Sequence, residues 1–173
     1  MHRTQNPTGP AADTDNTTVV TPADILRGAA CYLEIHGLVK GAYYAPDGQA
    51  FPPASTVGAL SCAAFGETHP ALPCRRPEWP VFRKAQRYLR DYLARRHEII
   101  PGEPGEFVFL QLHNWNDAAD QTAAHVITTL RAAADEWDYA HASEDDLETY
   151  AEACIANETH PTREGFLAWL GAR

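Results

Sequence analysis

The sequence lacks the features that would place it at once in several large classes of protein. No apolar run approaches the roughly 18 residues of a membrane span, and residues 1–20 have no apolar signal-peptide core. The glycine patterns that bind dinucleotides or triphosphates are also missing. These absences predict a cytoplasmic protein that has no membrane segment and no recognisable cofactor site. The first 20 residues, rich in Thr, Pro, Asp and Asn, are expected to be a disordered tail.

Patterns for disulfides and metal sites are missing as well. The four cysteines form no Cys-x-x-Cys pair, and no His-Glu-x-x-His motif occurs. Without a secretory signal, reduced thiols and no bound metal are expected. His113 and Asp117 would share a face only if their segment were helical, and this Asn-rich stretch is expected to turn instead.

The net charge of −9 conceals an uneven distribution. Residues 75–96 contain eight Lys or Arg against two acids, whereas residues 97–173 contain three Arg against fifteen acids. A helix predicted over 81–97 has one apolar face and one basic face, and the basic face carries Arg83, Lys84, Arg87 and Arg90. These four could bind an anion or nucleic acid. We favour a solvated face, or one neutralised by the acidic start of the helix after Ser143, and do not expect nucleic-acid binding.

Capping residues and apolar periodicity predict a mainly helical protein. The predicted helices cover 21–36, 56–65, 81–97 and 122–137, and two more begin after Ser143 and Thr162. The short apolar run 107–112 is interpreted as a strand or a buried turn. We therefore predict one compact domain over 21–173, a bundle of five to six helices with at most one short extended pair.

The stretch Trp115-Asn116-Asp117 is the most distinctive local motif. The structural interpretation is a turn in which Trp115 enters the core while Asn116 and Asp117 bond nearby backbone amides, with Asp120 or Thr122 capping the next helix. The functional interpretation places Asp117 in a cleft as a base and Asn116 as a positioning group. We favour the turn, around which a site could still be built.

Three segments resemble a family of small uncharacterised proteins from actinobacteria and bacteriophages. They are ADILRGAACYLEIHGLVKGAYY, STVGALSCAAFG and LHNWNDAADQTAAHVITTLRAAA, and together they span 23–134 with gaps. The most specific match is Trp115-Asn116-Asp117 followed by Thr122. Family members usually have Cys where this chain has Ser55, which counts against a cysteine mechanism shared by all of them. The resemblance implies a common fold but no reaction, and it makes 135–173 an extension.

Three functional hypotheses follow. The first is a non-enzymatic binding or accessory protein for a small molecule or a protein partner, with a site lined by Trp115, Asn116, Asp117, Tyr43 and Tyr44. The second is a small hydrolase or transferase that uses Asp117 with a nearby His or hydroxyl. Its candidate catalytic residues are Asp117, Asn116, His125 and Ser55, with Cys62 and His113 as further options. The third is anion or nucleic-acid binding through the basic helix.

Overall fold

The computed structural model describes residues 19–68, 70, 73–100 and 107–172. Within these residues the chain is helical and has no strand, so the predicted mainly helical class is confirmed. Two isolated β-bridges, which join Ala54 to Leu38 and to Tyr44, stand in place of the extended pair. The helices are α1 (Pro22–His36), α2 (Thr56–Phe65), η1 (Pro73–Arg75), α3 (Trp79–Arg95), α4 (Val108–Asp117), α5 (Ala123–Ala140), α6 (Glu144–Ala156) and α7 (Arg163–Gly171).

Side-chain caps fix where most of the helices begin. In five of them the hydroxyl of the preceding residue accepts a hydrogen bond from a backbone N–H of the first turn, which would otherwise lack a partner. These capping residues are Thr21, Ser55, Thr122, Ser143 and Thr162. Four of these caps were expected from the sequence, and Thr122 was one of two alternatives with Asp120, which is why the predicted starts of these helices agree with the structure.

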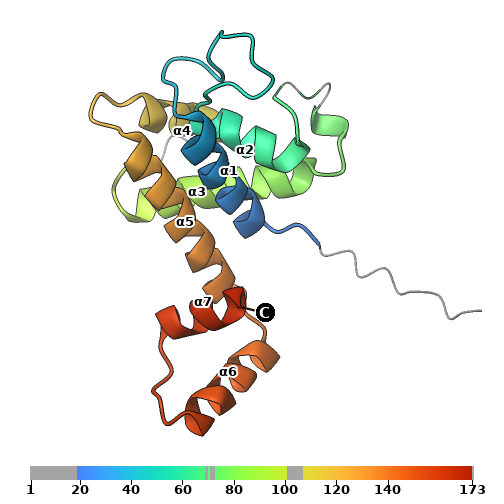
Figure 1. Cartoon of the computed structure of the whole chain (residues 1–173). Coiled ribbons are helices and arrows are strands. Elements are labelled where there is room, and N and C mark those ends of the chain that lie inside the picture. The colour runs from blue at the N-terminus through green and yellow to red at the C-terminus, as the bar shows by residue number, and fades with distance from the viewer. Residues whose placement is uncertain (1–18, 69, 71–72, 101–106, 173) are drawn as a thin grey trace, which may run out of the picture.

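The core forms where α1 packs against α2 on one side and α5 on the other (Figure 1). Small residues allow the α1–α2 contact, since a Cβ added at Gly28 would lie only 3.0 Å from the Cβ of Ala63. Helix α3 contributes the fully buried Leu89 and Leu93 to the same core. The core is therefore continuous across α1, α2, α3 and α5. Burial of this apolar surface is what stabilises the domain.

Helix α4 was not predicted, and it corrects the interpretation of Trp115-Asn116-Asp117 as a turn before a helix. These three residues are the last three of α4, and the helix begins within the apolar run that was interpreted as a strand or buried turn. Val108, Leu112 and Trp115 are all buried, at the spacing of one helical face. The helical spacing of the buried residues continues into the polar end of the segment. Their burial outweighs the preference of the asparagines for a turn.

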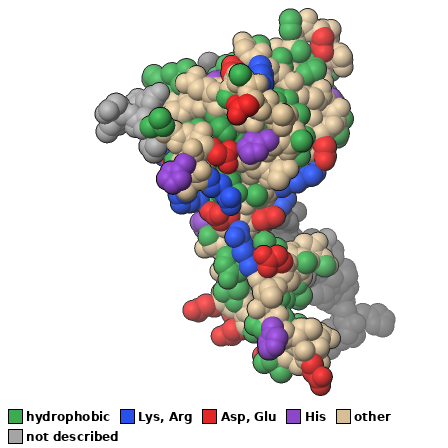
Figure 2. Space-filling model, turned by 90° about the vertical axis from the view of Figure 1, so that its left-hand side faces the viewer, with side chains coloured by type: hydrophobic (Ala, Val, Ile, Leu, Met, Phe, Trp, Pro, Cys, Tyr) green, Lys and Arg blue, Asp and Glu red, His purple; other side chains and the backbone are tan. Residues whose placement is uncertain are grey.

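Helices α6 and α7 project from the end of α5, away from the core (Figure 1). Each buries one residue, Cys154 on α6 and Phe166 on α7. Tyr150 joins the two helices, with its ring centroid 5.5 Å from that of Phe166. Acidic side chains are visible along this narrow part of the molecule (Figure 2). Because so little is buried, we expect this pair of helices to open at a lower free energy than the core.

Two further expectations concern membrane-spanning helices and the N-terminal tail. No helix in the described part of the chain is long and apolar enough to cross a membrane. The expected disordered tail lies outside the described residues, except for residues 19 and 20.

Candidate functional site

Asn116 joins three parts of the chain that are distant in sequence. It is 0% exposed. Its Oδ1 accepts hydrogen bonds from the backbone N and the Oγ1 of Thr56, at 2.9 and 2.8 Å. Its Nδ2 donates to the carbonyl oxygen of Val39 at 3.0 Å and to Oδ1 of Asp117 at 2.8 Å. Since both acceptor and both donor positions of the amide are used, Asn116 fastens the end of α4 to the start of α2 and to the segment that follows α1.

Asp117 strengthens this connection. Its Oδ1 also accepts a hydrogen bond from the backbone N of Gly41 at 3.0 Å. Partial burial raises the pKa of Asp117, but hydrogen bonds from Asn116 and Gly41, together with the charges of His113 and Lys40, outweigh that effect and lower it. Asp117 therefore acts as an ionised acceptor that holds the backbone before the two tyrosines.

Replacing Asp117 with asparagine should weaken the fold in a pH-dependent way. The pKa of Asp117 is lower in the folded chain than in the unfolded chain, so the carboxylate stabilises the fold above pH 4 and loses this effect as pH falls through the folded pKa. We expect the variant to be about 1 kcal/mol less stable at pH 7, with the difference shrinking below pH 4. Urea unfolding at several pH values measures this. The same difference at pH 3, or an equal loss in the exposed control Asp120→Asn, would contradict the assigned role.

Trp115 and His125 meet at a residue that the sequence did not single out. The Trp115 Nε1–H donates to Oε2 of Glu98 at 3.0 Å, and Nε2 of His125 lies 3.0 Å from the same oxygen. The three residues line a polar hollow of about 560 Å³ beside the start of α5. Trp115 is 6% exposed, so it anchors the core as expected. His125 is paired with Glu98, and no described hydrogen bond links it to Asp117 or Ser55.

Two further catalytic candidates, Ser55 and His113, lie on α2 and α4 or next to them. Ser55 is fully buried, and its Oγ accepts a hydrogen bond from the backbone N of Gly58 as the cap of α2. His113 lies one helical turn from Asp117, because the segment is a helix and not the turn that was predicted. Burial lowers the pKa of His113, and the nearby Asp117 opposes this only in part. Among the described residues, no group of three His, Cys, Asp or Glu side chains could hold a metal ion.

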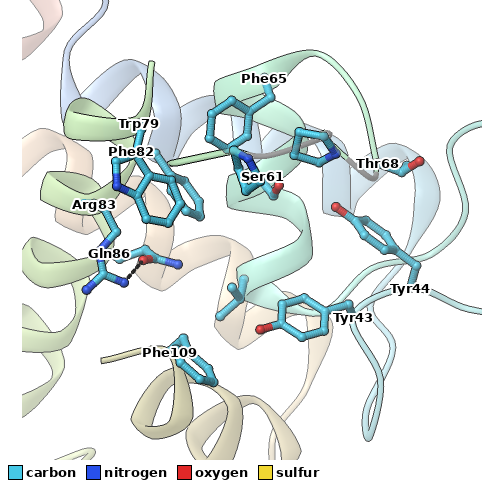
Figure 3. A pocket seen from close by; sticks show the side chains of 13 residues that line it. Tyr43, Tyr44, Ser61, Phe65, Thr68, Trp79, Phe82, Arg83, Gln86 and Phe109 are labelled. Atoms are coloured by element: carbon cyan, nitrogen blue, oxygen red, sulfur yellow. Dashed lines mark hydrogen bonds between the residues drawn. The ribbon is translucent and has the colours of Figure 1, made fainter. Parts of the chain in front are cut away.

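A pocket of about 410 Å³ lies between α2, α3 and α4, and Tyr43 and Tyr44 form one wall of it (Figure 3). We call it the aromatic pocket, after the six aromatic rings among its lining residues: Tyr43, Tyr44, Val57, Ser61, Phe65, Thr68, Pro70, Pro73, Trp79, Phe82, Arg83, Gln86 and Phe109. The two tyrosines were predicted to line a site with Trp115, Asn116 and Asp117. Those three residues do not line this pocket. Asn116 and Asp117 instead hold the backbone of Val39 and Gly41, just before the tyrosine wall, whereas Trp115 bonds Glu98.

The close fit of that wall depends on Gly58 of α2. A Cβ at this position would lie 2.4 Å from the carbonyl oxygen of Tyr43 and 3.1 Å from Cε1 of Tyr44. The Tyr44 hydroxyl also donates to the carbonyl oxygen of Gly58 at 3.0 Å. Burial raises the pKa of both phenols, so they remain neutral at physiological pH. The wall is therefore uncharged, and it lies directly against the backbone of α2.

Of the residues that α3 contributes to the pocket, only Arg83 was singled out from the sequence, as a candidate for anion binding. Gln86 is 2% exposed and lies one turn after Phe82 on the apolar face of the helix. A polar residue within an apolar helical face was the available signal, since a buried amide needs hydrogen-bonding partners. Phe109 was missed for a different reason, because α4 itself was not predicted.

The four predicted anion-binding residues have different surroundings. Arg83 lines the aromatic pocket, and its guanidinium lies over the ring of Trp79 at 5.7 Å. The Nζ of Lys84 lies 4.7 Å from the ring of Trp137 on α5. Arg90 pairs with its neighbour Asp91 at 2.6 Å, and Arg87 is exposed. Figure 2 shows the Lys and Arg side chains of one face mostly where the broad and narrow parts of the molecule meet. Of these four described residues, Arg83 is the one found among the lining residues of a cavity.

Comparison with known proteins places the chain in a family. Residues 17–136 match the model of a family of unknown function, DUF6197, so the match ends within α5 and leaves out α6 and α7. No curated protein and no solved structure shows significant similarity. The match includes the aromatic pocket and the residues that hold its walls. The chain therefore belongs to the family of unknown function DUF6197.

Proposed function

We propose that this protein binds a small, flat and largely apolar molecule in the aromatic pocket. The observation that carries the proposal is the pocket itself: a cavity of about 410 Å³ with aromatic walls and a few polar groups from α2 and α3. Cavities of this size that are mainly apolar, with a small number of placed polar groups, are typical of small-molecule sites. Aromatic walls favour a flat ligand, because stacked and edge-on ring contacts add to the burial of apolar surface.

The residues that hold the pocket wall in place favour a binding function over a catalytic one. The hydrolase or transferase hypothesis depends on Asp117 and Asn116. Both amide atoms of Asn116 are engaged by Thr56, Val39 and Asp117, and Oδ1 of Asp117 accepts from Gly41. They keep the tyrosine wall in position and are not among the residues that face the cavity. A rigid frame of this kind suits a binding site, because preorganised walls reduce the entropy cost of binding.

Fluorescence of N-phenyl-1-naphthylamine, a neutral two-ring probe, tests the proposal. We expect saturable binding at one site, with affinity reduced roughly tenfold or more by Ser61→Phe, because the added ring fills the cavity from α2. Cys31→Phe adds the same ring on the exposed side of α1 and should leave binding unchanged. Absence of saturable binding, or equal affinity in the two variants at matched melting temperature, would refute the proposal.

A further inference from the structure

We infer that the ligand of the aromatic pocket is an organic acid, a flat apolar body that carries one oxyanion such as a carboxylate, sulfonate or phosphate. This inference rests on the proposed function and names the chemical class of the ligand. The oxyanion would bind the side chains of Arg83 and Gln86 on α3. The apolar body would lie among the rings of the opposite walls.

The charge of the pocket points to an anion. Among the lining residues that the structure describes, Arg83 is the one ionised side chain, and none is Asp or Glu. Tyr43 and Tyr44 stay neutral, because burial raises the pKa of both phenols. A cationic ligand would face an uncompensated guanidinium across apolar walls, whereas an anionic ligand would neutralise it.

Arg83 is available to such a ligand. No ion pair of Arg83 is seen in the part of the chain that the structure describes, although Arg27, Arg76, Arg90, Arg95 and Arg131 each pair with a carboxylate. Its Nη1 donates to Oε1 of Gln86 at 3.1 Å, and its guanidinium plane is supported by the ring of Trp79. A guanidinium has five N–H donors, so this one hydrogen bond leaves others for an oxyanion.

Gln86 supplies the second donor. A guanidinium can only donate, so the Gln86 carbonyl oxygen must face Arg83 and the Nε2 amide must point the other way. Figure 3 shows this amide nitrogen directed from Arg83 toward the cavity. Gln86 is 2% exposed, and no acceptor for its Nε2 is found among the described residues. An oxyanion beside Arg83 would provide the acceptor.

The remaining walls indicate what is attached to the oxyanion. Phe65 and Tyr44 present carbon surface across the cavity from Gln86, and Phe82 adds a ring beside Gln86 on α3 (Figure 3). The hydroxyl of Tyr43 points toward the side of the pocket that α3 and Phe109 form. A free phosphate or sulfate ion would leave this apolar surface uncovered. A flat organic acid would cover it and place its charge at the α3 wall.

Two probes with the same rings test the inference. 8-Anilino-1-naphthalenesulfonate differs from N-phenyl-1-naphthylamine by one sulfonate group. For each variant we would measure the ratio of the two dissociation constants, neutral probe over sulfonate. We expect this ratio to fall tenfold or more in Arg83→Met, and less in Arg83→Lys, which keeps the charge but loses the planar fork. Gln86→Met should also lower it. The ratio should not change in Arg87→Met, which removes an exposed arginine one turn further along α3.

The outcomes separate this inference from the proposed function. If both probes bind and Arg83→Met leaves the ratio unchanged, the organic-acid inference is wrong and the proposed binding function stands. An equal fall in Arg87→Met would assign the preference to general surface charge, which also overturns the inference. If neither probe binds the folded wild-type protein, the proposed function and the inference both fail. Melting temperatures of all variants show that each comparison is made on folded protein.

Discussion

Replacing Asn116 with leucine is expected to lower the free energy of unfolding by about 3–5 kcal/mol. The substitution removes four hydrogen bonds and leaves the buried N–H of Thr56 and the carbonyl oxygen of Val39 without their partner. Each buried polar group left unsatisfied costs about 1–3 kcal/mol. For a chain of this length the melting temperature should fall by roughly 10 °C. Urea unfolding and calorimetry measure both quantities.

The control for this prediction is on the same helix. Asn114 is exposed two residues earlier on α4, and Asn114→Leu should change stability by no more than about 0.5 kcal/mol. Asn116→Leu should also weaken probe binding, because the segment before Tyr43 loses the hydrogen bond between Val39 and α4 and keeps only the one between Gly41 and Asp117. An Asn116→Leu protein as stable as the Asn114→Leu protein would show that the amide does not join these segments.

Replacing Gly58 with alanine should both destabilise the protein and impair the pocket. The new Cβ would lie 2.4 Å from the carbonyl oxygen of Tyr43, which accepts a hydrogen bond from the backbone N of Ser55. Backbone must move to relieve this contact, at a cost of about 2 kcal/mol, although alanine is the better helix former. Because the moved backbone carries the tyrosine wall, we expect probe affinity to fall roughly tenfold or more.

Gly171 provides the matched control. It also lies in a helix, but a Cβ at this position meets no atom within 4 Å. Gly171→Ala should therefore be neutral, or stabilising by up to about 1 kcal/mol, and should leave probe binding unchanged. Wild-type stability and affinity in Gly58→Ala would mean that the tyrosine wall does not depend on close contact with α2.

Local signals in the sequence were sufficient for most of the fold. Thr21, Ser55, Thr122, Ser143 and Thr162 each precede an apolar helical pattern, and in each case the hydroxyl caps the expected helix. These signals can be recognised because capping and helical periodicity act within a few residues. Helix α3 begins two residues before the predicted start, where Trp79 and Pro80 enter without a side-chain cap.

Helix α4 could not be recognised by the same means. It has no side-chain cap, its apolar part is short, and its last turn contains two asparagines and an aspartate. Tertiary contacts stabilise this last helical turn, since Asn116 accepts a hydrogen bond from Thr56, sixty residues earlier in the chain. No local pattern records a partner at that distance. This is why the motif was interpreted as a turn whose side chains bond nearby backbone amides, whereas the amides they bond, those of Thr56 and Gly41, are distant in sequence.

The site was predicted in part for a similar reason. Tyr43 and Tyr44 were singled out, and they line the aromatic pocket, but their role in binding a ligand remains a prediction. Arg83 was assigned to a basic surface because its sequence neighbours are basic. Its distinct environment becomes visible only when α2 and α4 pack beside α3. A pocket formed by three helices depends on their packing, which short sequence windows do not report.

The most direct test of the account uses the four tryptophans as reporters, since only Trp79 lines the aromatic pocket. In two-dimensional NMR spectra, 8-anilino-1-naphthalenesulfonate would be titrated into the labelled protein, with the Trp79 indole signal assigned through Trp79→Phe. The account predicts a saturable shift of the Trp79 indole N–H and little change at the other three tryptophans. A saturable shift at Trp115, beside the Glu98–His125 hollow, with Trp79 unmoved would contradict it and place the site elsewhere.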